Sequence, residues 1–88
     1  MEIVLLEQAR KDLEYWKKVG DQSIMKKITA LLKDICEHPY IGIGKPEALK
    51  YELAGKWSRR INSEHRIVYS VDENIITVYV FSMRYHYK

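Results

Sequence analysis

The sequence has little cysteine, proline and glycine, and it has no long apolar run. It holds one cysteine, two prolines and four glycines among 88 residues. Because Cys36 stands alone, an intramolecular disulfide is excluded, and with it a disulfide-stabilised secreted scaffold. The longest mostly apolar run, residues 75–81, is far shorter than the roughly 18 residues of a membrane span, so no membrane role is expected. Residues 1–6 lack the features of a signal peptide, and we expect a cytoplasmic protein.

The charge of the chain is only modestly one-sided. Fifteen Lys and Arg stand against twelve Asp and Glu, a net charge of +3 that permits a polyanionic partner without requiring one. Hydrophobic residues make up 47% and charged residues 31%, the balance of a folded globular domain. We predict a single domain over residues 1–88. Its positive excess is concentrated in residues 45–66, where phosphate contacts are expected.

Two amphipathic helices are predicted after a short apolar segment, residues 1–6, that suits a strand. Apolar residues recur at helical spacing in two stripes, Ala9, Leu13, Trp16 and Val19, then Ile24, Met25, Ile28, Leu31, Leu32, Ile35 and Cys36. Gly20 suits a left-handed helix end, and Asp21 can cap the next helix. His38 and Pro39 should end the second helix.

The apolar period changes to two in the second half, which predicts an antiparallel meander. The expected strands, separated by short turns, are residues 49–53, 56–61, 66–71 and 75–83. We therefore predict an α+β fold. Two N-terminal helices pack on one face of a twisted, mostly antiparallel four- to five-stranded sheet, and the other face is free for function.

Alternation along the strands places cations on the free face. If Ile67 and Tyr69 point toward the helices, Arg66 must point away from them. The adjacent Arg59 and Arg60 must also point to opposite faces. We assign Arg60 to the free face with Arg66, and expect Arg59 to escape burial near the strand end or through a bulge. The alternative is that all of these cations are ordinary solvated surface charges.

Residues 42–46, the sequence Gly-Ile-Gly-Lys-Pro, superficially look like a nucleotide-binding loop. The glycine spacing and the Ser or Thr after the lysine are absent, so we interpret the segment as a flexible loop that places Glu47. His38 and His65 do not stand at the spacing of a metal site. No metal or cofactor is predicted.

Four blocks of sequence resemble one known family, the YoeB-type toxins of the RelE superfamily. The blocks are GKPEALK at residues 44–50, LAGKWSRRI at 53–61, EHRIVY at 64–69 and RYHY at 84–87. The resemblance runs along essentially the whole chain. It implies a RelE-like, microbial-ribonuclease-like fold in a toxin of a type II toxin–antitoxin system. Such a toxin cleaves messenger RNA in the ribosomal A site and so inhibits translation.

The resemblance also implies roles for individual residues. Glu47 matches the general base, Arg66 the group that stabilises the phosphate, and His86 the general acid. The positions that would hold RNA are Lys50, Arg60, Tyr85 and Tyr87, the two tyrosines being suited to stack on exposed bases.

These residue types suit RNA cleavage without a metal ion. A base removes the proton of the 2′-hydroxyl, which attacks the adjacent phosphorus, while an acid protonates the departing 5′-oxygen. Glutamate is ionised at neutral pH, and histidine is readily protonated beside a phosphate. Arginine can place two donors on the phosphate oxygens.

The expected partners are messenger RNA, the ribosome, a YefM/Phd-like antitoxin and a second copy of the chain. One alternative is a noncatalytic toxin of the RelE/ParE fold that binds another target such as DNA gyrase. Another is an RNA-binding module that grips phosphates without cutting. Taken alone, a terminal histidine is more often a solvated residue than an acid catalyst, and only the combined motif favours catalysis.

Overall fold

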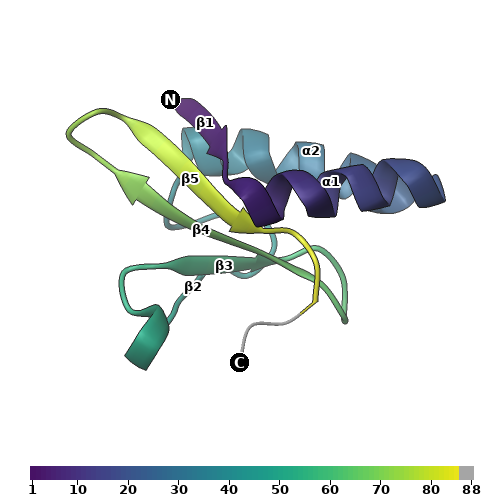
Figure 1. The fold of residues 1–88 in the computed structure, drawn as a ribbon. Helices are drawn as coiled ribbons and strands as arrows, with labels where there is room; N and C mark the ends of the chain where they lie inside the picture. Colours follow the sequence, from purple (N-terminus) through teal and green to yellow (C-terminus); the bar gives the residue numbers. More distant parts are fainter. Residues whose placement is uncertain (86–88) are drawn as a thin grey trace.

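The computed structural model describes residues 1–85, and residues 86–88 lie outside the described part. Two helices and five strands follow one another within residues 1–85 (Figure 1). Their bounds are β1 (Glu2–Leu5), α1 (Glu7–Val19), α2 (Gln22–Glu37), β2 (Glu47–Ala48), the 3-10 turn η1 (Tyr51–Leu53), β3 (Trp57–Arg60), β4 (Arg66–Asp72) and β5 (Thr77–Ser82). The predicted α+β class is confirmed.

The helix ends lie where the sequence placed them. Gly20 ends α1 in the left-handed region, at φ 69° and ψ 30°, and its N–H donates to the carbonyl of Trp16 at 3.1 Å. Asp21 caps α2, because its Oδ1 accepts from the N–H of Ile24 at 3.0 Å. His38 closes α2 directly before Pro39. Within residues 1–85, no helix is long and apolar enough to cross a membrane.

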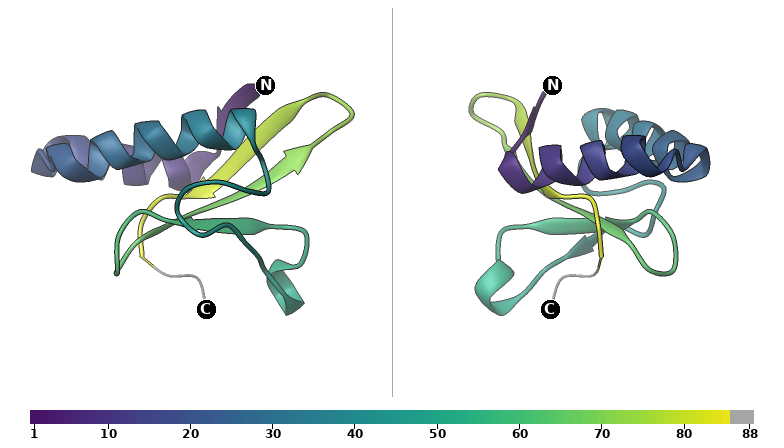
Figure 2. Two further views of the ribbon diagram at one scale, coloured as in Figure 1. Left: turned by 180° about the vertical axis from the view of Figure 1, so that it is seen from behind. Right: turned by 45° about the vertical axis from the view of Figure 1, so that its right-hand side comes forward.

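The five strands form one mixed sheet in the order β1-β5-β4-β3-β2. Three neighbouring pairs are antiparallel, as the short turns predicted, but β1 runs parallel to β5 with Glu2 opposite Thr77. Both helices cover the same face of the sheet (Figures 1 and 2). β2 therefore lies at the edge of the sheet opposite β1, and β3 and then β4 lie next to it.

The hydrophobic core lies between the helices and this covered face. Its buried members are Ala9, Trp16, Ile24, Ile28, Leu31, Ile35, Ile61, Ile67, Tyr69, Val78, Val80 and Met83. They include part of each predicted helical stripe and alternate residues of β4 and β5, as expected for amphipathic elements. Val19 of the first stripe is instead exposed. Ile67 and Tyr69 point to the helices, and so Arg66 and Val68 point to the opposite face.

The strand predicted for residues 49–53 was wrong. β2 ends at Ala48, and the chain then makes consecutive tight turns in which Leu53 N–H donates to Lys50 and Lys56 N–H donates to Leu53. Tyr51 adopts φ +58° and is 92% exposed. The alternation that predicted the strand is misleading, because a short connection between β2 and β3 must reverse direction within these residues.

The last strand is shorter than residues 75–83. Ile75 and Ile76 are exposed and belong to the turn after β4, and Ile76 has φ +51°. Asp72 Oδ1 accepts from the N–H of Asn74 at 3.0 Å and of Ile75 at 3.3 Å, which extends the turn by hydrogen bonding. Ile75 and Ile76 thus resemble part of a strand in the sequence, but their backbone forms a turn.

Candidate functional site

The sheet face opposite the helices brings Glu47 and Arg66 together. In the ladder, Glu47 of β2 lies opposite Ser58 of β3, which lies opposite Val68 of β4, and Arg66 lies opposite Arg60. Side chains two residues apart on a strand share a face, so these groups line one surface. Glu47 Oε1 lies 3.7 Å from Arg66 Nη1. Two of the three residues predicted to be catalytic are therefore neighbours.

Arg66 is held more rigidly than Glu47. The arginine is 8% exposed, and its Nη1 lies 3.4 Å from the hydroxyl oxygen of the fully buried Ser58. The Glu47 side chain is 56% exposed. The ion pair is therefore buried on its guanidinium side and exposed to solvent on its carboxylate side.

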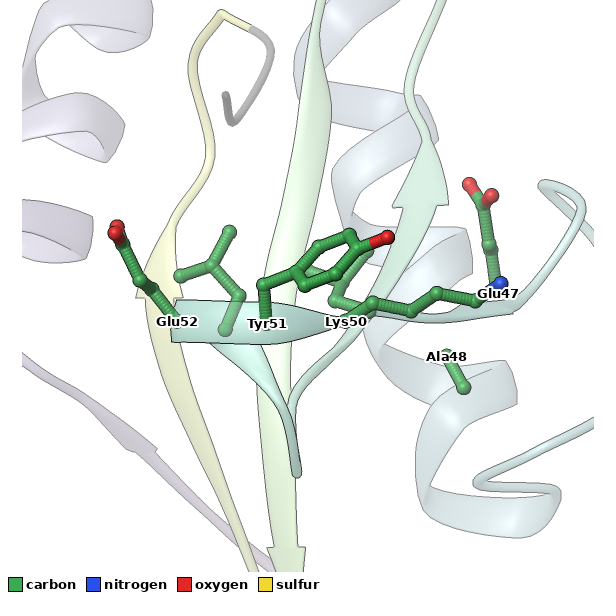
Figure 3. Close-up of a pocket in the computed structure, with 7 residues that line it drawn as sticks. Glu47, Ala48, Lys50, Tyr51 and Glu52 are labelled. Carbon is green, nitrogen blue, oxygen red and sulfur yellow. The ribbon is translucent and has the colours of Figure 1, made fainter.

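A shallow pocket adjoins Glu47. Residues 47–53 line a cavity of about 520 Å³ formed by β2 and η1. Figure 3 shows the side chains of Glu47, Tyr51 and Glu52 projecting to one side of this segment, whereas Ala48 points to the other. Lys50 also lines the pocket and is exposed. Together with the exposed Arg60, it provides positive charge near the Glu47–Arg66 pair.

The chain end carrying the predicted acid reaches Arg66 through the backbone. Arg66 N–H donates to the carbonyl of Tyr85 at 3.2 Å. Tyr85 is 54% exposed, and its hydroxyl accepts from Arg84 Nη2 at 2.7 Å. His86 and Tyr87 lie outside the described residues, so their predicted roles remain predictions.

Arg59 corrects one expectation. We expected it to escape burial, but it is 0% exposed and points toward the helices. Its Nη1 pairs with Asp34 of α2, and its Nε donates to the Tyr69 hydroxyl at 3.2 Å. Its two terminal nitrogens also donate to backbone carbonyls of the loop after α2, namely those of His38, Ile41 and Ile43. The guanidinium is buried because every side of it meets an acceptor.

The buried Arg59 organises the loop that leads to Glu47. Hydrogen bonds hold this loop in place, so it is not the flexible segment that the sequence predicted. Asp34 also accepts from the N–H of Ile43 at 3.1 Å, and Tyr69 donates to the carbonyl of Pro39 at 2.6 Å. Gly44 accepts from the N–H of Arg60 at 2.7 Å, which joins the loop to β3. Glu47 is thus positioned by contacts with α2, β3 and β4.

The pKa values of Asp34 and Tyr69 are consistent with their roles as acceptor and donor in this network. The hydrogen bond from Arg59, more than any other cause, lowers the pKa of Asp34 below its usual value. Burial raises the pKa of the Tyr69 phenol, which therefore remains a neutral donor at physiological pH. Sequence reasoning missed Arg59, although one signal was present. An arginine whose side chain points from a strand toward the core is seldom buried without an acidic partner. Asp34, on the preceding helix, is such a partner.

Comparison with known proteins identifies the family. Residues 5–87 match the model of the YoeB-like toxins of bacterial type II toxin–antitoxin systems. The toxin YoeB of Escherichia coli K12 is 44% identical over 87 residues, covering 99% of this chain and all of that protein.

Solved structures give the same result. A YoeB/ParE toxin from Agrobacterium tumefaciens has 39% identity and a TM-score of 0.94, covering 99% of this chain and 100% of the other. YoeB from Staphylococcus aureus was solved as a dimer, with 44% identity and a TM-score of 0.88. It was also solved as a heterotetrameric complex with the antitoxin YefM, with 45% identity and a TM-score of 0.87. Each covers 99% of this chain and 98% of the other. The chain belongs to the YoeB-like toxins of bacterial type II toxin–antitoxin systems.

Proposed function

We propose that this chain is an endoribonuclease that cleaves messenger RNA in the ribosomal A site and so stops translation. The observation that carries the proposal is the Glu47 carboxylate 3.7 Å from the Arg66 guanidinium, on a surface with the exposed cations Lys50 and Arg60. A carboxylate beside a phosphate-binding arginine provides a base next to the phosphate it must serve. The family resemblance supplies the target.

The reaction needs three groups and no metal ion. Glu47 takes the proton of the 2′-hydroxyl, and the resulting oxygen forms a bond to the adjacent phosphorus. The bond from phosphorus to the 5′-oxygen breaks, and protonated His86 gives its proton to that oxygen. The products are a 2′,3′-cyclic phosphate on one fragment and a 5′-hydroxyl on the other.

Arg66 stabilises the charge that accumulates on the two nonbridging phosphate oxygens. Its planar guanidinium can donate to both oxygens at once through two parallel N–H groups in a fixed geometry, which the rotating ammonium group of a lysine does not provide. Since Arg66 is already buried against β3, little conformational entropy is lost when it binds phosphate. Lys50, Arg60, Tyr85 and Tyr87 hold the flanking nucleotides by charge and by stacking.

The ribosome contributes positioning. Glu47 is more than half exposed, and the pocket beside it is shallow, so the protein alone encloses little of an RNA strand. A message fixed in the A site presents one phosphate in a defined geometry, and such positioning accounts for a large part of many rate enhancements. The site of action places the toxin in the cytoplasm.

We further propose a YefM-type antitoxin and a second copy of this chain as partners, because the Staphylococcus aureus relative was solved with each. Light scattering of the purified chain should give the mass of two copies. Adding a YefM-type antitoxin should stop cleavage. A monomer, or cleavage that persists with bound antitoxin, would contradict this part of the proposal.

The test maps message ends after the purified chain meets translating ribosomes. Glu47→Gln and His86→Gln should each slow cleavage by roughly a hundredfold to ten-thousandfold, since each removes one proton transfer. Arg66→Lys retains charge but loses the paired donors and should also cut slowly. Glu37→Gln, an exposed glutamate at the end of α2, is the matched control and should cut at the wild-type rate.

The outcomes separate the rival functions. Cyclic phosphate ends that appear at the wild-type rate with Glu37→Gln, but much more slowly with the other three variants, support the proposal. Intact message together with inhibited DNA gyrase would favour a noncatalytic toxin. Salt-sensitive RNA binding without cleavage would favour an RNA-binding module. Equal cleavage by all variants would remove the site assignment.

A further inference from the structure

Helix α1 fixes the point at which β5 ends. Asp12 Oδ2 accepts from the N–H of Met83 at 2.9 Å, and Trp16 Nε1 donates to the carbonyl of Met83 at 2.9 Å. Both side chains are buried, and both project from the same face of α1. Every hydrogen-bonding group of the Met83 backbone is therefore held by a helix, and the chain leaves β5 in a defined direction.

His65 provides a second attachment two residues farther along. Its Nδ1 accepts from the N–H of Tyr85 at 2.7 Å, while Arg66 N–H donates to the Tyr85 carbonyl at 3.2 Å. Tyr85 adopts φ +61°, a left-handed conformation that is unfavourable for a non-glycine residue. Such a conformation persists only where neighbouring groups hold it, and the two hydrogen bonds do so.

The imidazole of His65 is itself held in place. It is 7% exposed, and its ring meets the edge of Trp16 at a centroid distance of 4.8 Å and tilts against Tyr85 at 5.3 Å. Because a backbone N–H can only donate, Nδ1 must be the unprotonated nitrogen of the ring. The other nitrogen, Nε2, lies 4.0 Å from Glu64 Oε1.

Ring packing alone explains the burial of His65 but not its hydrogen bond. A phenyl ring would fill the same space between Trp16 and Tyr85, yet only an acceptor at the Nδ1 position satisfies the Tyr85 N–H. The residue after Tyr85 in sequence is His86, the proposed general acid. The residue after His65 is Arg66, the proposed phosphate ligand.

We propose that His65 is a positioning residue for the cleavage reaction. By fixing the backbone of Tyr85 it constrains the residue that directly precedes His86, the proposed general acid, in the sequence. Two consecutive residues, His65 directly before β4 and Arg66 at its start, thus serve the same reaction: Arg66 binds the phosphate and His65 fixes the residue before the proposed acid. This inference rests on the proposed function, because it assigns His65 to the same reaction.

The test compares acceptors at two positions of the ring. In His65→Asn the amide oxygen takes the place of Nδ1 and can accept from Tyr85, whereas in His65→Gln the polar end takes the place of Nε2. His65→Phe keeps the ring and removes both nitrogens. We expect Phe and Gln to lower kcat roughly tenfold to a hundredfold with little change in KM, and Asn to recover most of the loss.

A double-mutant cycle tests whether His65 acts through His86. In a His86→Gln background, His65→Gln should cause no further loss, because the group it positions is already absent. Losses that multiply would overturn the inference. His38→Phe, the same change at an exposed histidine, is the matched control for His65→Phe and should leave kcat unchanged.

Amide hydrogen exchange of Tyr85 measures the hydrogen bond that anchors its N–H to His65, without any cleavage assay. Exchange should be slow in wild type and His65→Asn and at least tenfold faster in His65→Gln, while thermal unfolding confirms that each variant is folded. Unchanged exchange in His65→Gln would overturn the anchor. A protected Tyr85 in a wild type that cuts no message would instead count against the proposed function, so the two failures are distinguishable. The Asn and Gln pair keeps the test decisive even where His65→Phe does not fold.

Discussion

The guanidinium of Arg59 lies wholly inside the protein and donates to the carboxylate of Asp34 on the neighbouring helix. The adjacent Arg60 is exposed on the opposite face. Two identical residues, one peptide bond apart, therefore have different tasks. Arg59 holds the loop that leads to Glu47, and Arg60 lies beside the proposed RNA path.

Arg59→Ala should be far more destabilising than Arg60→Ala. The first change leaves the Asp34 carboxylate and three backbone carbonyls without their donor, and each buried acceptor that loses its partner costs about 1 to 3 kcal/mol. The second alters an exposed side chain and should shift the free energy of unfolding by less than about 0.5 kcal/mol. Urea unfolding of both variants measures the difference. Equal midpoints would show that the buried network contributes nothing to stability.

Lowering the pH should remove part of the stability that the contact between Arg59 and Asp34 provides. The pKa of Asp34 is lowered in the folded protein, first by its hydrogen bond from Arg59. A group with a lowered folded-state pKa stabilises fully above its unfolded-state pKa of about 4, and the contribution is lost as pH falls through the folded-state pKa. The stability difference between wild type and Asp34→Asn should be constant from neutral pH to about pH 5 and shrink below about pH 4. A difference that stays constant under acid would contradict this linkage.

Gly42→Ala should destabilise the loop more than Gly55→Ala. Both glycines have positive φ, +126° and +91°, so each substitution introduces backbone strain. At Gly42 the new Cβ would also clash with the Asp34 carboxylate, whereas at Gly55 nothing lies within 4 Å. We expect losses of roughly 2 to 6 kcal/mol and roughly 1 to 2 kcal/mol respectively. Thermal unfolding measures both, and a larger loss at Gly55 would refute the clash.

Lys50→Ala and Arg60→Ala should weaken RNA binding in a salt-dependent way. A 2′-O-methyl RNA lacks the attacking hydroxyl, so binding can be measured without cleavage. If each cation contacts one phosphate, its loss should reduce the slope of log affinity against log salt by about 0.7. Lys18→Ala, at an exposed position in the last turn of α1, should leave the slope unchanged. Identical slopes for all three variants would place the RNA elsewhere.

The helices were predictable because their signals are local. Apolar spacing, the glycine after α1 and the aspartate before α2 all act within a few residues, and each was found where expected. The parity of β4 was also predictable, because Ile67 and Tyr69 could be buried only by turning Arg66 away. That parity is what brought Glu47 and Arg66 to one face.

The errors involve turns and distant partners. Leu49 and Leu53 carry a strand pattern, but the turns near Tyr51 are required by the short path from β2 to β3. Nothing in the sequence of β1 indicates that its partner is β5 in parallel orientation. Arg59 was misjudged because three of its acceptors are backbone carbonyls, which every residue has and no sequence pattern marks.

The pairing of β1 with β5 has a consequence during synthesis. Residues 2–5 leave the exit tunnel long before residues 77–82 have been polymerised, so the first strand has no edge to join and α1 lacks the strand on which it packs. Long-range parallel pairing also forms slowly. The sheet can therefore be completed, and α1 can be packed, only after β5 has been made.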